Sequence, residues 1–439
     1  MQHVVTCRLV PAILLCVLLP SSSLAWQAPA TYQDKNAAHW VGQLSHPEKR
    51  TRRLAAYALG RIAPQNADAV TALVKGVVDD DLDVCRYSIY ALGRIGPMAG
   101  SAAPRLARVI ERETDNFYRR GAVRALGNIE AGDARSRSVL TAALKDKDLV
   151  LRVDAALALL KLDQSKLRTN SAAVQTLDDA ISGSDAQARY QATAGLAQLG
   201  SAAKALGGAL LRALRSDDAD VRRSAARAIG AIGYGAIAPL TRMLDDPNPR
   251  TRASVVAALG WCGEVTHRRV LSDSATPVEK ITAANSAIRD VAVPALVGLL
   301  SDADESVRRA AAAALARMNS LALPALVQSL RADDPRVRQG AGRALDTLTP
   351  ALQKSAADAP AMQEIKTAVL PDVVAAIAHD DVETRYQAVR LFVILAYDRK
   401  SVAETDAEPR LRERLKDPDS RVRGYASGAL RQLQSKPKD

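Results

Sequence analysis

The sequence predicts an all-α solenoid of about twelve stacked antiparallel helix pairs. Two observations predict this fold class: a pattern of acids, arginines and small apolar residues returns about a dozen times, and an apolar segment follows each copy. The pattern is clear in residues 217–233, which read DDADVRRSAARAIGAIG. Repetition with a period of roughly 30–45 residues is the signature of a repeat architecture. Because a catalytic site occurs only once in a chain, a feature of every unit is first of all architecture.

The copies align on an anchor position that is arginine in ten of twelve cases. Successive anchors lie 28 to 47 residues apart, so the units vary in length but not in order. Cysteine and lysine occupy the two exceptions. The anchors are Arg52, Cys85, Arg119, Arg152, Arg189, Arg222, Arg252, Lys280, Arg308, Arg338, Arg385 and Arg423.

Each unit is expected to begin with a helix cap four residues before the anchor. Asp, Asn and Thr cap helices because their side chains accept the free backbone N–H groups of the first turn. In three copies proline follows the cap, where its missing N–H costs nothing. The cap positions are Glu48, Asp81, Asp115, Asp148, Asp185, Asp218, Asn248, Thr276, Asp304, Asp334, Asp381 and Asp419.

Small and apolar residues then recur three, six, seven and ten positions after the anchor, which is one face of a helix. Glycine recurs at the eighth position although it costs about 1 kcal/mol in a helix relative to alanine. We therefore expect another backbone to pass close to Gly60, Gly93, Gly127, Gly230 and Gly260. A glycine eleven positions after the anchor fits a helix end with positive φ, at Gly96, Gly200, Gly233 and Gly263.

A second apolar helix follows each capped helix, for example ALGGALLRALR from Ala205. It ends in an acidic turn such as Asp245–Asp246, which leads into the next cap. A single helix pair cannot bury its apolar face alone, so neighbouring pairs must stack.

The anchor arginine lies near the positive end of the helix dipole, where a cation is mildly unfavourable. We expect the cap aspartate of its own or the adjacent repeat to offset this, giving a ladder of Asp–Arg contacts. The alternative is that some of these arginines face outward and bind an acidic partner. The residues predicted to form the ladder include Asp218, Arg222, Asp304, Arg308, Asp334 and Arg338.

Two-helix units with Asp, Val-Arg, Ala and Leu-Gly in this order resemble HEAT repeats, and most closely the phycobilisome-lyase-like subgroup. Examples are DVCRYSIYALGRIG and DESVRRAAAAALARM. The resemblance extends from about Glu48 to Leu433. It implies an α-solenoid, and most arrays of this family are binding scaffolds. The subgroup name does not imply lyase activity.

The predicted organisation follows from these repeats and from two irregular stretches. An insertion at 349–372 is either a surface loop or a degenerate helix, and residues 396–409 are also stretched. The predicted segments are a signal peptide at 1–25, an N-terminal cap at 26–47, HEAT-like repeats at 48–348 and 373–433, and a tail at 434–439.

Residues 1–25 are typical of a secretory signal peptide. Arg8 precedes an apolar run from Leu9 to Leu19, and Ser23 and Ala25 suit cleavage before Trp26. The run is shorter than the ~20 residues of a spanning helix. An uncleaved anchor is the alternative. The sequence therefore predicts an exported protein, periplasmic or secreted, in which Cys85 and Cys262 are buried, unpaired thiols.

The formal net charge is +12, and several second helices carry cations along one side. In HEAT-like arrays the second helices usually line the concave surface, so a basic groove for acidic partners is one interpretation, and ordinary solvated helix faces are the other. The candidate partner-binding residues are Arg105, Arg108, Arg112, Arg212, Arg215, Arg268, Arg269 and Arg412, with His267, Arg410 and Arg414 beside them.

A search for chemistry gives no catalytic, cofactor-binding or metal-binding candidates. His39, His46, His267 and His379 lack ligand spacing, and no phosphate-binding loop or nucleophile motif occurs. Nucleic acid is disfavoured because the tryptophans are isolated among the cations. The sequence thus favours a non-catalytic scaffold that binds a protein or acidic polymer and needs no cofactor. The second hypothesis is a lyase-like or oxidoreductase-like enzyme with an unrecognised cofactor.

Overall fold

The computed structural model describes residues 31–63, 66–163, 171–272, 278–354, 360–395, 397 and 400–434. For 201–202, 266–272, 278, 280, 351, 353–354 and 360–362 it describes the backbone alone. The chain divides into two compact units, Met1–Ala209 (unit 1) and Leu210–Asp439 (unit 2). The whole predicted signal peptide at 1–25, residues 26–30 of the predicted N-terminal cap and residues 435–439 of the predicted tail therefore lie outside the described residues.

Unit 1 opens with a short antiparallel hairpin that pairs Thr31 with Asn36 and Tyr32 with Lys35. All its other regular elements are helices. The elements are β1 (Thr31–Tyr32), β2 (Lys35–Asn36), α1 (Ala37–Gln43), α2 (Lys49–Ile62), α3 (Ala67–Gly76), α4 (Leu82–Ile95), α5 (Ala103–Arg112), α6 (Asn116–Asn128), α7 (Ala134–Ala143), α8 (Leu149–Asp163), α9 (Ser171–Ser182) and α10 (Ala186–Leu199).

All regular elements in the described residues of unit 2 are helices, and α11 begins at the end of unit 1. Its helices are α11 (Gly207–Ala213), α12 (Ala219–Ile232), α13 (Ile237–Thr241), α14 (Pro249–Ser272), α15 (Val278–Ser286), α16 (Val293–Gly298), α17 (Glu305–Arg317), α18 (Leu323–Ser329), α19 (Pro335–Lys354), α20 (Pro360–Ile377), α21 (Val382–Ile394), α22 (Ala407–Arg414) and α23 (Ser420–Gln434). The predicted fold class, an all-α solenoid, is confirmed.

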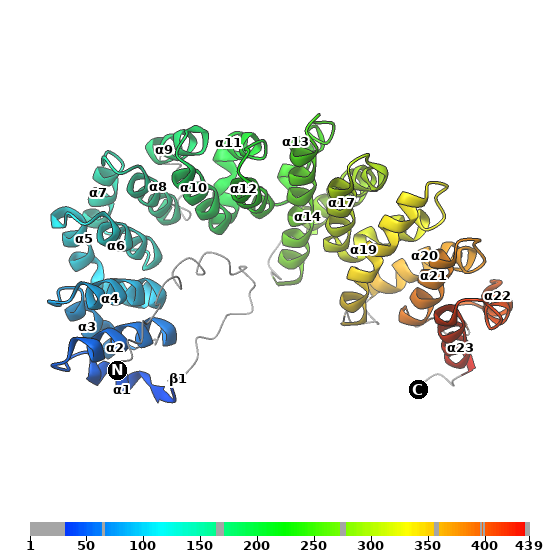
Figure 1. The fold of residues 1–439 in the computed structure, drawn as a ribbon, viewed down its shortest axis with the longest axis horizontal. Coiled ribbons are helices and arrows are strands. Elements are labelled where there is room, and N and C mark those ends of the chain that lie inside the picture. The colour runs from blue at the N-terminus through cyan, green and yellow to red at the C-terminus, as the bar shows by residue number, and fades with distance from the viewer. Residues whose placement is uncertain are drawn as a thin grey trace, which may run out of the picture. The chain divides into compact units, whose positions relative to one another are not determined.

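Each unit consists of two layers of helices (Figure 1). In unit 1 the capped helices α2, α4, α6, α8 and α10 form the inner layer of a curve, and α3, α5, α7 and α9 form the outer layer. In unit 2 the capped helices α12, α14, α17, α19, α21 and α23 likewise form the inner layer. The residues that line the inside of each unit therefore come from the capped helices, not from the second helix of each pair.

The predicted caps are confirmed in the described repeats, with Glu48 as the exception. Asp81, Asp115, Asp185, Asp218 and Asp381 each accept a hydrogen bond from a backbone N–H two or three residues further on. Glu48 begins α2 without a side-chain bond to the backbone. Its longer side chain instead accepts a hydrogen bond from the Thr51 hydroxyl at 2.9 Å.

The glycines at the eighth position lie where neighbouring inner helices approach most closely. A Cβ added at Gly127 would lie 3.1 Å from the Cα of Ala158, and one at Gly93 would lie 3.3 Å from the Cα of Ala125. This confirms the expected close backbone approach. Gly96, Gly200 and Gly233 have positive φ, as predicted for helix ends.

Gly263 was predicted to end its helix, and this prediction is wrong. α14 continues through it to Ser272. A Cβ at Gly263 would lie 2.7 Å from the Met318 side chain, so this glycine permits contact with α17. Gly263 thus allows the close approach of a neighbouring helix, as predicted for the glycines eight positions after the anchor.

The copy anchored at Lys280 does not form a repeat. Residues 278–301 run as one helical stretch, with a π-helical segment at Ala287–Ala292, and pack in the outer layer against α13 and α18. α14 packs directly on α17, where a Cβ at Gly260 would lie 2.9 Å from the Cα of Ala314. Eleven capped helices, rather than twelve, therefore form the repeats of the described chain.

Within the predicted insertion at 349–372, the described residues belong to two helices, and residues 355–359 lie outside the described part of the chain. α19 continues through Pro350 to Lys354, and α20 begins at Pro360. Leu352 is buried, and the Thr349 hydroxyl donates to the Leu345 carbonyl at 2.6 Å. Burial of this apolar face explains how α19 extends past a proline.

Candidate functional site

The anchor arginines bind the loop that precedes their own helix. In repeat after repeat the guanidinium Nη1 donates to the backbone carbonyls six and five residues earlier. Arg222 donates to Ser216 at 2.6 Å and Asp217 at 2.8 Å. Arg308 and Arg338 repeat this geometry at 2.6 to 2.9 Å. The arginine thereby supplies hydrogen-bond donors to backbone carbonyls of the turn that leads into the helix.

Four anchors also reach an aspartate of the following repeat, two residues before its cap. The pairs are Arg52–Asp79, Arg119–Asp146, Arg252–Asp302 and Arg385–Asp417. This second contact joins consecutive repeats across their loops. We call this arrangement, the anchor arginine with the backbone carbonyls that it contacts and this aspartate, the joint; at Arg119 the carbonyl is that of Ile110, at 3.2 Å.

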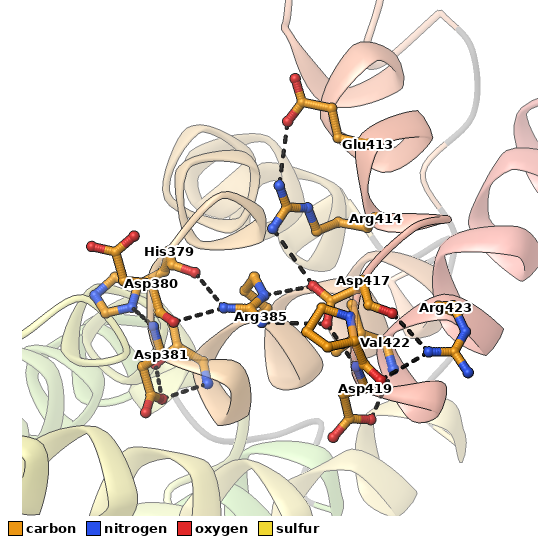
Figure 2. Close-up of polar contacts among 12 residues, drawn as sticks. His379, Asp380, Asp381, Arg385, Glu413, Arg414, Asp417, Asp419, Val422 and Arg423 are labelled. Carbon is orange, nitrogen blue, oxygen red and sulfur yellow. Dashed lines mark hydrogen bonds and ion pairs between the residues drawn. The ribbon is translucent and has the colours of Figure 1, made fainter.

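The joint of Arg385 is the most buried of the four (Figure 2). Arg385 is 9% and Asp417 0% exposed, and Nε donates to Asp417 Oδ2 at 2.7 Å. Nη1 donates to the carbonyls of His379 at 3.0 Å and Asp380 at 2.7 Å. Burial alone would raise the pKa of Asp417, but the hydrogen bonds from Arg385 and the Asp419 backbone N–H, together with the charges of Arg385 and Arg414, outweigh it and leave this pKa below its ordinary value. The carboxylate is therefore charged and structural.

The predicted ladder is therefore correct in residue types but wrong in its partner. Among the described residues, no hydrogen bond between side chains and no ion pair joins the cap to the anchor in Asp218–Arg222, Asp304–Arg308 or Asp334–Arg338; only the anchor backbone N–H donates to the cap carbonyl, as in any helix. Each of these caps instead accepts backbone N–H groups of the first turn. In the first turn of the helix, the cap carboxylate is occupied by its own backbone and the anchor side chain points to the preceding loop.

In unit 1 the cap aspartates pair with the residue after the anchor of the preceding repeat. The pairs are Arg53–Asp81, Arg86–Asp115 and Arg120–Asp148, at 2.5, 3.0 and 2.5 Å. The hydrogen bond from Arg53 lowers the pKa of Asp81 to about 2. A second, more exposed row of Asp–Arg contacts thus runs along the edge of the inner layer.

Cys85 takes over part of the anchor's role in the second repeat. Its thiol donates to the Asp79 carbonyl six residues earlier, at 3.1 Å, as an anchor arginine would. Tyr118 occupies the adjoining space and donates to the Val77 carbonyl. Cys85 and Cys262 are both buried and free, as predicted, and burial raises the pKa of Cys262 to about 12.

A shallow cavity of about 340 Å³ lies over the joint of Arg385. Charged side chains line it: His379, Asp380, Arg385, Glu413, Arg414, Lys416 and Asp417. The buried members already hold one another, and Arg414 adds a contact to Asp417 at 3.5 Å. This arrangement can hold loops together. No group of three or more His, Cys, Asp and Glu residues in the described part of the chain is placed to bind a metal ion.

The structure places the predicted partner-binding arginines of α5 and α22, and those on and directly after α11, in the outer layer, whereas Arg268 and Arg269 lie on the inner-layer helix α14. Arg105, Arg108 and Arg112 lie on α5 in the outer layer of unit 1. The expectation that second helices line the concave side is wrong, because the capped helices form the inner layer in both units. Arg215 pairs with Asp246 at 2.8 Å and Arg412 with Glu408 at 2.7 Å, while Arg212 lies on α11. The side chains of Arg268 and Arg269 lie outside the described residues.

The inner layer of unit 1 instead concentrates arginine and tyrosine. On α2, α4 and α6 these residues recur one, two, five and nine positions after the anchor, which is the face turned away from the outer layer. All are partly or fully exposed. We call this set the Arg–Tyr surface: Arg53, Tyr57, Arg61, Arg86, Tyr87, Tyr90, Arg94, Arg120 and Arg124.

Aromatic rings on this surface pack edge to face. Tyr57 lies 5.5 Å from Tyr87 and 5.7 Å from Tyr32, measured between ring centroids. The chain holds only ten tyrosines, so this grouping is not a product of composition. The sequence analysis missed it, although the positions five after Arg52 and Cys85 are both tyrosine.

Unit 2 carries a smaller group of the same kind. Arg227 lies 5.5 Å and Arg317 4.5 Å from the ring centroid of Trp261. The sequence analysis treated Trp261 as isolated, and this is wrong. Its two cations come from α12 and α17, helices on either side of α14, so only the fold brings them together.

The HEAT-repeat family model matches residues 37–127, 208–289 and 280–346, which together span just over half of the chain. The chain belongs to the HEAT-repeat proteins. The phycobilisome-lyase-like subgroup stays a prediction. No curated protein matches the chain.

Several solved structures are similar to this HEAT-repeat chain at low sequence identity. An engineered protein is 23% identical, with a TM-score of 0.33, and the match covers 91% of this chain and 99% of that one. Kap95p is 14% identical, with a TM-score of 0.49 and coverage of 91% and 56%. The karyopherin Kap121p bound to Pho4p is 13% identical, with a TM-score of 0.48 and coverage of 94% and 46%. The chain spans about half the length of these karyopherins.

One helical stretch in the described part of the HEAT-repeat chain is long and apolar enough to cross a membrane. It is Ile281–Ser301, with 21 residues and a mean hydropathy of 1.3. Its Ile288, Val293 and Leu296 side chains are buried within unit 2. Length and composition therefore fit a packed repeat helix equally well.

A buried carboxylate lies behind the Arg–Tyr surface. Asp154 on α8 is 2% exposed, and its Oδ1 accepts from Arg124 Nε at 2.9 Å and Gln191 Nε2 at 3.0 Å. Its Oδ2 is buried and has no hydrogen-bond partner in the described structure. Burial raises the pKa of Asp154, although Arg124 and Arg120 oppose this.

Replacing Asp154 with Asn should leave unit 1 at least as stable at neutral pH, because it removes a buried charge with an unsatisfied oxygen. Because the pKa of Asp154 is higher in the folded than in the unfolded state, the folded state binds its proton first. The contribution of Asp154 to the free energy of unfolding therefore becomes more favourable as the pH falls towards the ordinary aspartate pKa of about 3.9. The variant lacks this gain. Urea unfolding at a series of pH values should show the difference between the two proteins shrinking as the pH falls, whereas a constant difference would contradict this account.

Proposed function

We propose that this HEAT-repeat protein is a non-catalytic scaffold that binds a partner protein on its inner layer. The observation that carries the proposal is the Arg–Tyr surface. Arginine, tyrosine and tryptophan are the residues most enriched at the energetic centres of protein interfaces. The acid and arginine groups of the joints are held by one another and serve to connect repeats.

The experiment is site-specific photo-crosslinking at matched inner and outer positions of unit 1. A photoreactive amino acid replaces Tyr90 on α4 in one protein and Arg108 on α5 in the other. Each is mixed with proteins of the source organism's exported fraction. A discrete crosslinked partner is expected from position 90 and not from position 108. Equal labelling from both positions, or a stoichiometric cofactor in the purified protein, would contradict the scaffold proposal.

Export of the protein is part of the same proposal and has its own test. The apolar run from Leu9 to Leu19 and the small residues before Trp26 support it. N-terminal sequencing of the protein recovered from the exported fraction should begin at Trp26. Recovery only from the cytosolic fraction with an intact N-terminus would refute export and leave the binding proposal standing.

A further inference from the structure

We infer that the Arg–Tyr surface of unit 1 binds an acidic, extended segment of its partner protein; this rests on the proposed function and specifies its ligand. The Arg–Tyr surface spans three consecutive inner helices, α2, α4 and α6. Its arginines and tyrosines therefore recur at regular intervals from helix to helix. This arrangement fits an extended peptide that lies across the helices better than a small, compact ligand.

The solvent-accessible charge of this surface is positive although aspartates lie beside it. The side chains of Arg53 and Arg124 are 45% and 49% exposed, whereas those of Asp81, Asp148 and Asp154 are 6% exposed or less. These three carboxylates thus lie beneath the guanidinium groups that they hold, whereas Asp83 and Asp115 stay about 40% exposed at the edge. A partner approaching from solvent meets mainly cations, and carboxylates of that partner would be attracted.

The guanidinium groups are also held in place before binding. Arg53 contacts Asp81 and Asp83, Arg86 contacts Asp115, and Arg124 contacts Asp154. A guanidinium has five N–H donors, so one bound through one or two of them can still donate to a second carboxylate. Since ordering a long side chain costs about 0.5–1.5 kcal/mol on binding, this pre-positioning favours affinity for an acidic ligand.

Tyrosine supplies contact area between the cations. Tyr32, Tyr57 and Tyr87 form a continuous edge-to-face row, and Arg53 lies near Tyr87. Burial, with the nearby Asp83 and Tyr57, raises the pKa of Tyr87, so its hydroxyl stays protonated and can donate to a carboxylate. An acidic segment with apolar or aromatic residues between its acids would match both components of this surface.

The same surface fits a polyphosphate less well. Asp83 and Asp115 remain about 40% exposed at the edge of the surface, next to Arg53 and Arg86. A nucleic acid carries a charge on every unit and would bring phosphates against these carboxylates. The rings pack edge to face on one another and do not form the parallel platforms on which bases stack. These features favour a protein ligand.

The test uses fluorescence anisotropy with three labelled probes: a peptide of alternating Glu and Tyr, its twin with Gln for Glu, and single-stranded DNA. The wild-type protein should bind the acidic peptide, with an affinity that falls as salt rises, and bind the other two at least about tenfold more weakly, which corresponds to about 1.4 kcal/mol. The variant Arg61→Glu/Arg94→Glu should lose at least about tenfold in affinity for the acidic peptide.

The matched control is Arg108→Glu/Arg112→Glu on α5, which changes the net charge of the same unit equally but in the outer layer. It should keep the wild-type affinity. Circular dichroism and unfolding midpoints identify any variant that has lost its fold, and Tyr57→Ala then provides a second inner-layer variant without a charge change. Equal losses in both arginine pairs, no binding of the acidic peptide, or tighter binding of DNA would overturn the inference. A partner crosslinked from position 90 would still support the scaffold in that case.

Discussion

Replacing Arg385 with alanine is expected to destabilise unit 2 by about 3–5 kcal/mol, because it leaves the Asp417 carboxylate buried without its partner. Asp417 is fully buried and receives two hydrogen bonds from this arginine, at 2.7 and 3.3 Å. The same substitution also removes the donor to two loop carbonyls. Urea unfolding followed by circular dichroism measures the loss.

Arg222→Ala is the matched control in the same unit. Arg222 occupies the same anchor position but donates to the Ser216 and Asp217 carbonyls alone among the described contacts, so no buried carboxylate is left behind. Its loss should be smaller, about 1–3 kcal/mol, the net value of two hydrogen bonds from a partly exposed guanidinium. Arg385→Ala/Asp417→Ala should recover part of the larger loss. Equal destabilisation by the two single variants would show that the buried aspartate does not distinguish the joints.

The caps and the close-approach glycines could be predicted because each has a local cause. A helix start needs an acceptor for its free N–H groups, which makes Asp at the fourth position before the anchor informative without a partner. Glycine eight positions after the anchor is costly in an isolated helix, so its recurrence points to a neighbour. Both inferences need only the chain's own period and the rules of helix packing.

The partner of the anchor arginine could not be predicted because it depends on the path of a loop. The sequence places Asp218 and Asp417 in similar acidic turns before a helix. Only the fold shows that the aspartate two residues before the cap pairs with the anchor arginine of the preceding repeat, while the cap accepts backbone N–H groups of its own helix. The recurring spacing between Asp79 and Asp81, and between Asp417 and Asp419, was the signal that could have separated these roles.

The Arg–Tyr surface was missed for a related reason. The sequence pattern predicts cations on the second helices, but the capped helices form the inner layer. In the sequence, Arg53 and Arg86 belong to the repeat pattern, and nothing local marks them as exposed. Trp261 lies 9 positions after Arg252, and its neighbours Arg227 and Arg317 are far from it in the sequence. Which face of a helix lines a curve follows from packing across several repeats.

Gly260→Ala should destabilise unit 2 by about 1–3 kcal/mol, the usual cost of overpacking, despite the gain of about 1 kcal/mol that alanine brings to an isolated helix. The new Cβ would lie 2.9 Å from the Cα and 3.0 Å from the Cβ of Ala314, so α14 and α17 would have to separate.

Gly424→Ala on α23 is the matched control: nothing lies within 4 Å of its added Cβ, and it should stabilise by about 0.5–1 kcal/mol. Opposite signs in unfolding measurements are the result expected from the direct contact between α14 and α17. A stabilising Gly260→Ala would contradict the close approach of Gly260 to Ala314 and with it the packing of α14 directly on α17.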